Sequence, residues 1–148
     1  MADAQSEVRA LLDSRSDAMR TKDIDRLMSL YSPDIVYFDL VPPLRYAGST
    51  ALRGRFLDWF QRWESAIGQE IGDVDISASG DLAAAYMLIR ASGTLKTGRE
   101  VGYWVRVTNS FRRSREGWLI THEHVSLPVE LPSGSAAMDL VPQPTGGA

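Results

Sequence analysis

Two histidines and one aspartate are the residues of this chain whose types and surroundings best suit acid–base chemistry. His122 and His124 are its two histidines and stand one residue apart in the segment WLITHEHVSLP. Alternate side chains of a β-strand point to the same face, so both imidazoles are predicted to face one way and Glu123 the other. Imidazole titrates near neutral pH, which makes both histidines candidate catalytic acids or bases. A metal site, or structural hydrogen bonding at a sheet face or dimer interface, would explain the same pattern.

Asp39 is the candidate general base. It stands between Phe38 and Leu40 in the apolar segment IVYFDLV. An unpaired carboxylate in apolar surroundings is disfavoured as the anion, which favours a role in accepting protons near neutral pH. The alternative is an aspartate at the end of a strand that accepts hydrogen bonds from backbone amides. Tyr37 shares the face of Asp39 and is a candidate wall residue of a substrate pocket.

Arg15 falls on the apolar face of a predicted N-terminal helix. An arginine in that position extends to the edge of the face or is buried with an acid. If it is buried, it could pair with Asp39 and oppose the role of that residue as a base. It could instead offer a fixed positive charge to a substrate oxyanion, and we predict it as a substrate-binding residue.

A second candidate substrate-binding group comes from the segment YWVRVT, in which Trp104 and Arg106 share one strand face. Arg106 is expected to face the polar cavity or the outer surface of the sheet. Counting outward from a turn centred near Arg115 places Arg106 opposite His124, and so on a shared face. Tyr86 is a further candidate wall residue.

Composition limits the classes of function. The chain has 148 residues, 44% of them hydrophobic, which predicts one domain with a real core. Its net charge of −3 comes from interspersed acids and bases, so we expect no nucleic-acid partner. No apolar run reaches the roughly 18 residues of a membrane span, and the charged N-terminal segment lacks an apolar signal core. We therefore expect a cytoplasmic protein with no membrane partner.

Cofactor and metal chemistry find little support in the sequence. There is no cysteine, which excludes disulfides and thiolate ligands. Neither a glycine-rich phosphate loop nor a G-x-S-x-G motif occurs. A metal could be held by both histidines with Asp39 as the carboxylate of a facial site. Since no further histidine or nearby acidic cluster supports that site, we predict no metal and no cofactor.

The order of elements predicts an α+β fold. Helical spacing of apolar residues indicates helices over residues 3–20, a short stretch from 23 and a long aromatic helix from 49. An early strand is predicted at 35–41, and four longer antiparallel strands at 70–79, 82–95, 101–113 and 118–127. We expect a cone-shaped, curved antiparallel sheet packed on helices, with a pocket at its open end.

Three segments carry a resemblance to a known family: KDIDRLMSLYSPDIVYFDLVPPL, GREVGYWVRVTNSFRR and GWLITHEHVSLP. Over residues 5–142 the chain resembles SnoaL-like, ketosteroid isomerase-related proteins of the nuclear transport factor 2-like superfamily. The resemblance implies a cystatin-like α+β barrel in residues 1–130. The Pro-, Gly-, Ser- and Ala-rich composition of residues 131–148 predicts a partly ordered tail. It places Asp39 at the position of the isomerase base, and Arg15 where the isomerases hold the enolate oxygen with a tyrosine. Their second oxyanion residue has no counterpart here.

The functional prediction combines these observations. We expect a pocket for a small hydrophobic molecule and a cofactor-independent isomerase, cyclase or lyase that acts by proton transfer. Asp39 would be the base, His122 or His124 the acid, and Arg15 or Arg106 the residue that stabilises developing charge. We also expect a homodimer that packs through its sheet faces. The alternative is a non-catalytic ligand-binding or oligomerisation module of the same fold.

Overall fold

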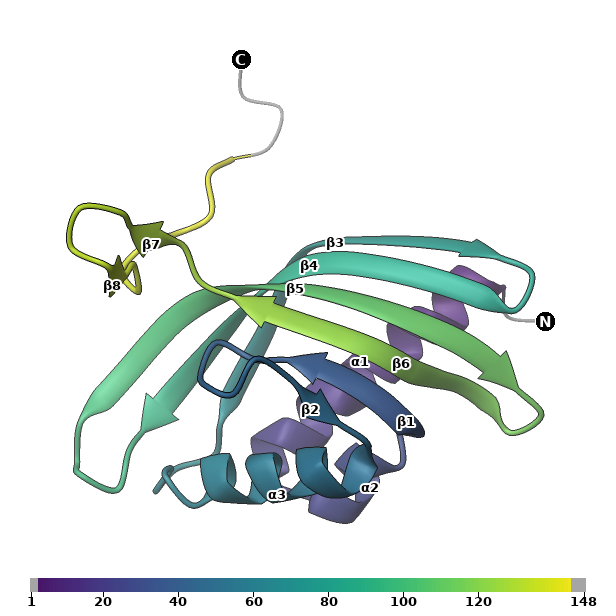
Figure 1. Ribbon diagram of the computed structural model, residues 1–148, viewed down its shortest axis with the longest axis horizontal. Coiled ribbons are helices and arrows are strands. Elements are labelled where there is room, and N and C mark those ends of the chain that lie inside the picture. The colour runs from purple at the N-terminus through teal and green to yellow at the C-terminus, as the bar shows by residue number, and fades with distance from the viewer. Residues whose placement is uncertain (1–2, 145–148) are drawn as a thin grey trace.

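A curved six-stranded sheet wraps over three helices in the computed structural model, which describes residues 3–144 (Figure 1). The helices are α1 (Ala4–Thr21), α2 (Ile24–Met28) and α3 (Ser49–Phe60). The sheet strands are β1 (Tyr31–Phe38), β2 (Tyr46–Ala47), β3 (Gly68–Ser79), β4 (Leu82–Thr94), β5 (Glu100–Ser114) and β6 (Gly117–Ser126). The predicted α+β cone, a curved sheet packed on helices, is confirmed.

The strand order β2-β1-β6-β5-β4-β3 places the first long strand beside the last one. The pairs β3–β4, β4–β5 and β5–β6 are antiparallel, as predicted, whereas β1 runs parallel to β6. Strand β1 begins at Tyr31, directly after α2, and ends at Phe38, so it starts earlier and ends earlier than the sequence indicated. Asp39 therefore follows the strand instead of lying within it.

Local sequence signals explain where the first two helices begin. The side chain of Asp3 accepts a hydrogen bond from the backbone N–H of Ser6 at the start of α1. Asp23 caps α2 in the same way by accepting from the N–H of Arg26. Between them, Lys22 adopts a left-handed backbone conformation with φ of 58°, which ends α1 and lets α2 turn away.

The core lies between the concave face of the sheet and the helices. Leu12 of α1 and Phe111 of β5 are each 1% exposed. From α3, the ring of Phe56 packs against Tyr31 and Tyr37 of β1, with centroids 5.7 and 5.6 Å apart. These contacts hold α3 under the β1 end of the sheet, where Asp39 leaves the strand.

A β-bulge interrupts β6 at Thr121. Ser110 pairs with His122, but the next residue, Phe111, pairs with Ile120, which leaves Thr121 without a partner on β5. One extra residue reverses the alternation of side chains for the rest of the strand. Ile120 and Glu123 therefore both face the core, and each is 0% exposed.

The bulge and the position of the turn also change the predicted register. Arg106 lies opposite Ser126, and His124 lies opposite Thr108. The predicted pairing of Arg106 with His124 is therefore wrong by two residues. Both side chains still lie on the same outer face of the sheet, because a shift of two residues preserves the face.

After β6 the chain forms a small hairpin that sequence patterning did not predict. Its strands are β7 (Val129–Glu130) and β8 (Ser135–Ala136), and it extends away from the helices (Figure 1). Residues 145–148 of the predicted tail lie outside the described residues. Among the helices of residues 3–144, none is both long and apolar enough to span a membrane.

The core assignment predicts that Leu12→Ala lowers the free energy of unfolding by about 2–5 kcal/mol, because it removes buried methyl groups and leaves a cavity. Leu44→Ala is the matched control, since Leu44 is 96% exposed. Urea denaturation followed by circular dichroism measures both variants. Equal stabilities for the two variants would contradict the placement of Leu12 in the core.

Candidate functional site

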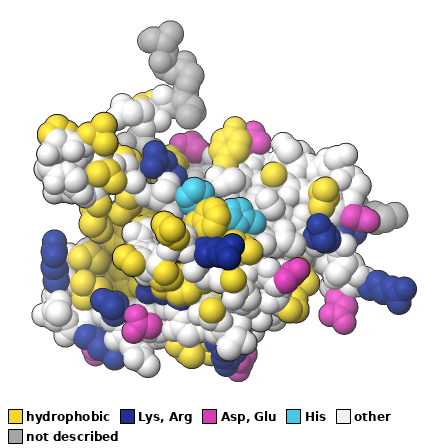
Figure 2. All heavy atoms as spheres, viewed as in Figure 1, with side chains coloured by type: hydrophobic (Ala, Val, Ile, Leu, Met, Phe, Trp, Pro, Cys, Tyr) yellow, Lys and Arg dark blue, Asp and Glu magenta, His cyan; other side chains and the backbone are white. Residues whose placement is uncertain are grey.

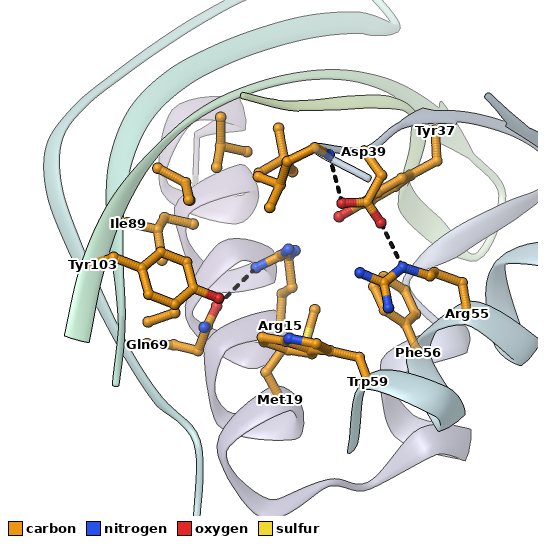
Figure 3. Close-up of a pocket in the computed structure, with 15 residues that line it drawn as sticks. Arg15, Met19, Tyr37, Asp39, Arg55, Phe56, Trp59, Gln69, Ile89 and Tyr103 are labelled. Carbon is orange, nitrogen blue, oxygen red and sulfur yellow. Dashed lines mark hydrogen bonds and ion pairs between the residues drawn. The ribbon is translucent and has the colours of Figure 1, made fainter. Parts of the chain in front are cut away.

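A pocket opens between the concave face of the sheet, α1 and α3 (Figure 3). Its cavity volume is about 60 Å³, and the space that no atom fills reaches about 530 Å³ when the open mouth is included. Most of its wall is apolar, with Met19, Phe56, Trp59 and Ile89 among the contributors. The polar side chains that reach it are Arg15, Tyr37, Asp39, Arg55, Gln69 and Tyr103.

Asp39 lines this pocket in a fixed orientation. Its Oδ2 accepts a hydrogen bond from Nε of Arg55 at 2.7 Å, and its Oδ1 accepts one from the backbone N–H of Leu40 at 2.7 Å (Figure 3). The side chains of Asp39 and Arg55 are 7% and 13% exposed. Since each carboxylate oxygen has two lone pairs and one partner within the described residues, both oxygens keep capacity for a ligand.

Arg15 enters the pocket from α1 but pairs with Glu123 instead of Asp39. Its Nη2 donates to Oε2 of Glu123 at 2.8 Å and its Nε to Oε1 at 3.1 Å, a two-point contact. The two side chains are 4% and 0% exposed. Nη1 points the other way and lies 3.4 Å from Oε1 of Gln69, beside the cavity (Figure 3).

Two more donors complete the surroundings of Glu123. The hydroxyl of Tyr31 donates to Oε1 at 3.0 Å, and Nδ2 of Asn109 donates to the same oxygen at 2.7 Å. Burial is the largest single effect and lowers the pKa of Arg15, but the negative charge of Glu123, its hydrogen bond to Arg15 and the nearby Tyr31 and Tyr37 together raise that pKa well above its ordinary value. Arg15 is therefore a permanent cation whose charge is balanced on the side away from the cavity.

Two tyrosine hydroxyls add neutral hydrogen-bonding groups to the pocket. Burial raises the pKa of Tyr37 well above its ordinary value, and the negative charges of Glu123 and Asp39 add to the shift. Burial also raises the pKa of Tyr103, against the opposing effects of a hydrogen bond with Trp59 and the charge of Arg55. Both hydroxyls keep their protons at neutral pH and can donate to a ligand oxygen.

Comparison with known proteins supports one family over most of the chain. The model of the SnoaL-like domain family matches residues 8–130. The chain belongs to the SnoaL-like domain family. No curated protein matches its sequence.

Solved structures share the fold of this SnoaL-like domain. A nuclear transport factor 2-like protein of unknown function from Pseudomonas putida KT2440 is 29% identical, with a TM-score of 0.85 over 94% of this chain and 96% of that one. A ketosteroid isomerase-like protein from Erwinia carotovora atroseptica is 21% identical, with a TM-score of 0.73 over 85% and 97%. A nuclear transport factor 2-like protein with a cystatin-like fold from Novosphingobium aromaticivorans is 17% identical, with a TM-score of 0.68 over 82% and 80%.

The two histidines of the SnoaL-like domain lie outside the pocket. Both stand on the outer face of the sheet, where Figure 2 shows them at the surface. The ring of Phe38 contacts both, with centroids 4.8 Å from His122 and 5.3 Å from His124. Nδ1 of His122 lies 2.7 Å from the carbonyl oxygen of Val36. We expected the histidines and Asp39 to share one pocket. They do not, because the bulge at Thr121 turns both histidines outward.

Three predicted substrate-binding residues also lie on the outer face. Arg106 is exposed and donates from Nε to the hydroxyl of Ser126 at 3.1 Å. Tyr86 is 59% exposed. Trp104 covers Gly72, where a Cβ atom would lie 3.3 Å from the indole ring. Of the two placements expected for Arg106, the outer surface is the one observed, and these residues do not meet Asp39.

The facial metal site is not assembled in this structure. Asp39 lines the pocket, whereas His122 and His124 stand on the opposite face of the sheet. Among residues 3–144, no group of three or more histidine, aspartate or glutamate side chains is arranged to hold a metal ion.

Sequence reasoning missed Arg55 and Glu123 as site residues. Arg55 follows Leu52 by three positions and precedes Trp59 by four, so helical spacing places it on the edge of the apolar stripe of α3. That spacing was a usable signal. Glu123 was expected on the face opposite the histidines, but its burial depends on the bulge, for which the sequence offered no signal.

Breaking the buried pair should destabilise the protein strongly. Glu123→Ala leaves Arg15 charged and unpaired, and we expect a loss of about 3–5 kcal/mol in the free energy of unfolding. The double variant Arg15→Met with Glu123→Ala should lose less than the sum of the single losses, because it buries no unpaired charge. Asp25→Ala, which removes an exposed partner of Arg53, is the control and should cost little. If the losses in the free energy of unfolding of the two single variants simply added in the double variant, the pairing of Arg15 with Glu123 would be contradicted.

The raised pKa of Tyr37 predicts weaker folding at alkaline pH. Above pH 10 an unfolded tyrosine loses its proton while the folded Tyr37 keeps it, so the folded state holds more protons and stability falls as pH rises. Tyr37→Phe removes this contribution, and the slope above pH 10 should become shallower by an amount that approaches about 1.4 kcal/mol per pH unit as the unfolded tyrosine ionises fully. Urea denaturation at pH 8 to 11 measures the slope. The difference in unfolding free energy between the two proteins at pH 8 gives the effect of losing the hydroxyl group itself. If wild type and variant had the same pH slope at high pH, Tyr37 could not be a buried, neutral hydroxyl.

Proposed function

We propose that this SnoaL-like domain binds a small, largely apolar molecule in its pocket and moves a proton on it, with Asp39 as the base. The observation that carries the proposal is an oriented carboxylate on the wall of an otherwise apolar cavity. Fixed polar groups in a dry pocket are worth more to catalysis than the same groups in water, because they need no reorganisation during the reaction. The proposed reaction is a cofactor-independent isomerisation, cyclisation or elimination.

Asp39 is suited to take a proton from a carbon next to a carbonyl group. Arg55 and the backbone N–H of Leu40 each occupy one of its oxygens, which fixes the plane of the carboxylate and leaves lone pairs for the substrate. As Asp39 takes the proton, the electron pair of the broken C–H bond moves to the carbonyl oxygen and gives an enolate. Return of the proton to another carbon completes an isomerisation, whereas departure of a leaving group from the neighbouring carbon completes an elimination.

The enolate oxygen needs hydrogen-bond donors, and the pocket supplies several. Nη1 of Arg15 and the hydroxyls of Tyr37 and Tyr103 belong to pocket-lining residues and can each donate. Tyr37 and Tyr103 also take the place that sequence reasoning gave to His122 and His124 as the acid partner. No residue of the outer sheet face takes part in the proposed reaction.

The cavity limits the size of the ligand. A volume of about 60 Å³ is less than half of the roughly 150 Å³ of an apolar cavity that binds benzene. The enclosed part therefore suits a group smaller than an aromatic ring, such as a carbonyl with its neighbouring carbons, and a ring must extend into the open mouth. The ketosteroid isomerase-like description of one structural relative supports the class of reaction but not a substrate of steroid size.

The second candidate is a ligand-binding module without catalysis. The ion pair between Asp39 and Arg55 favours it, because a paired carboxylate can have a purely structural role.

For either function, we propose a homodimer through the outer sheet face, where the exposed side chains include Leu82 and Tyr86.

Proton transfer can be tested before the natural substrate is identified. Incubating the protein in D₂O with a panel of small cyclic and aromatic ketones should speed the exchange of protons next to the carbonyl, as measured by proton NMR. Asp39→Asn removes the base and should reduce that exchange by at least about 100-fold, within the range general bases contribute. Asp58→Asn is the matched control, since its carboxylate also lies near Arg55 but is 61% exposed.

Exchange that survives in Asp39→Asn would assign the reaction to another group. Binding of a ketone without any exchange, in the wild type as well as the variant, would favour the non-catalytic module.

A further inference from the structure

Each arginine that lines the pocket forms a close ion pair with a carboxylate. Arg15 pairs with Glu123 at 2.8 Å, and Arg55 pairs with Asp39 at 2.7 Å. The other titratable side chains that line the pocket are Tyr37 and Tyr103, which are neutral at physiological pH because the ordinary tyrosine pKa is about 10 and burial raises the pKa of both further. The formal charges of the pocket-lining residues, taken together with that of Glu123, therefore sum to zero.

The arrangement of the two pairs differs in a way that matters for a ligand. Asp39 faces the cavity, so an anionic ligand beside it meets a like charge. Glu123 stands behind Arg15 and is 0% exposed, so it cancels the charge of Arg15 without offering the ligand an acceptor. What the ligand meets at that end is a hydrogen-bond donor, Nη1, with little net positive charge.

Such a pocket treats neutral and anionic ligands differently. A carboxylate that leaves water must recover its hydration free energy from an uncompensated positive charge, which none of the described residues of the pocket wall supplies. A ketone or amide oxygen loses far less hydration and is satisfied by the same donors. Neutral acceptors are thus favoured although two arginines line the wall.

We propose that the cavity selects uncharged carbonyl compounds over anions of the same shape, and that Glu123 is the residue that sets this selectivity. The inference rests on the ligand-binding half of the proposed function and deepens it. It does not depend on whether Asp39 moves a proton. Glu123 touches no ligand; it acts through Arg15, and its other contacts to Tyr31 and Asn109 hold it in place.

Acetophenone and benzoate make a matched pair of probes, because they differ mainly in a methyl group replaced by a charged oxygen. At pH 7 and fixed ionic strength, the wild-type protein should bind acetophenone at least about tenfold more tightly than benzoate. Titrations followed by proton–nitrogen NMR report both affinities and show which residues respond. Equal binding, or tighter binding of benzoate, would overturn the proposal.

Glu123→Gln tests the assigned residue. It keeps an oxygen acceptor for Tyr31 and Asn109 but leaves Arg15 with an uncompensated charge, so the preference should shift toward benzoate by about tenfold or more. Asp25→Asn is the control, because it makes the same change in net charge at an exposed surface pair. A shift of equal size in both variants would assign the effect to overall charge and overturn the role of Glu123.

Asp39→Asn provides an independent check if Glu123→Gln is too unstable to titrate. It removes the closer carboxylate partner of Arg55 and leaves the exposed carboxylate of Asp58 at 3.9 Å, so it should also shift the preference toward benzoate. No shift in this variant would contradict the idea that charge balance controls selection. Failure of the deuterium exchange alongside a retained preference for acetophenone would refute the proposed catalysis and leave the selectivity standing.

Discussion

The ion pair between Arg15 and Glu123 is the interaction on which the rest of this structure depends. Two fully buried charges are costly unless every group around them is arranged to compensate. Here the compensation comes from four elements: α1 supplies Arg15, β6 Glu123, β1 Tyr31 and β5 Asn109. The helix and three strands must therefore meet in one relative position, and the pocket is the space left beside that junction.

The bulge at Thr121 makes the junction possible. Without the extra residue, Glu123 would point to the face opposite Ile120 and Arg15 would be buried alone. The same residue decides which chemistry faces outward, since it turns His122 and His124 to the surface. One irregularity in the pairing of β5 with β6 thus places Glu123 inside the molecule and the two histidines on its outer face.

Much of the architecture could be predicted from local patterns. The spacing of Val8, Leu12 and Met19 indicated α1 and placed Arg15 on its buried stripe, and the turn residues located the four long strands within a few positions. Asp39 and Tyr37 were predicted as pocket residues and do line the pocket. These features depend on periodicity, which a sequence carries directly.

The partners of those residues could not be predicted in the same way. Pairing Asp39 with Arg55 requires the packing angle of α3, and pairing Arg15 with Glu123 requires the bulge. The sequence prediction assumed strict alternation of side chains along β6 and so placed the histidines on the inner face. It could not include the bulge, because a bulge has no reliable local signature. Residues that share a face can be read from a sequence, but contacts across elements depend on the assembled molecule.

The parallel pairing of β1 with β6 has a consequence for how the chain reaches this structure. His122 and Val36 are 86 positions apart, yet they lie side by side where β1 pairs with β6. In a nascent chain the edge of β1 that faces β6 stays unpaired until the last long strand has been made, although β2 and α3 can already pack against β1. Closing so long a loop is slow compared with forming the local hairpins from β3 to β6, so the pairing of β1 with β6 is expected to be a late step of folding.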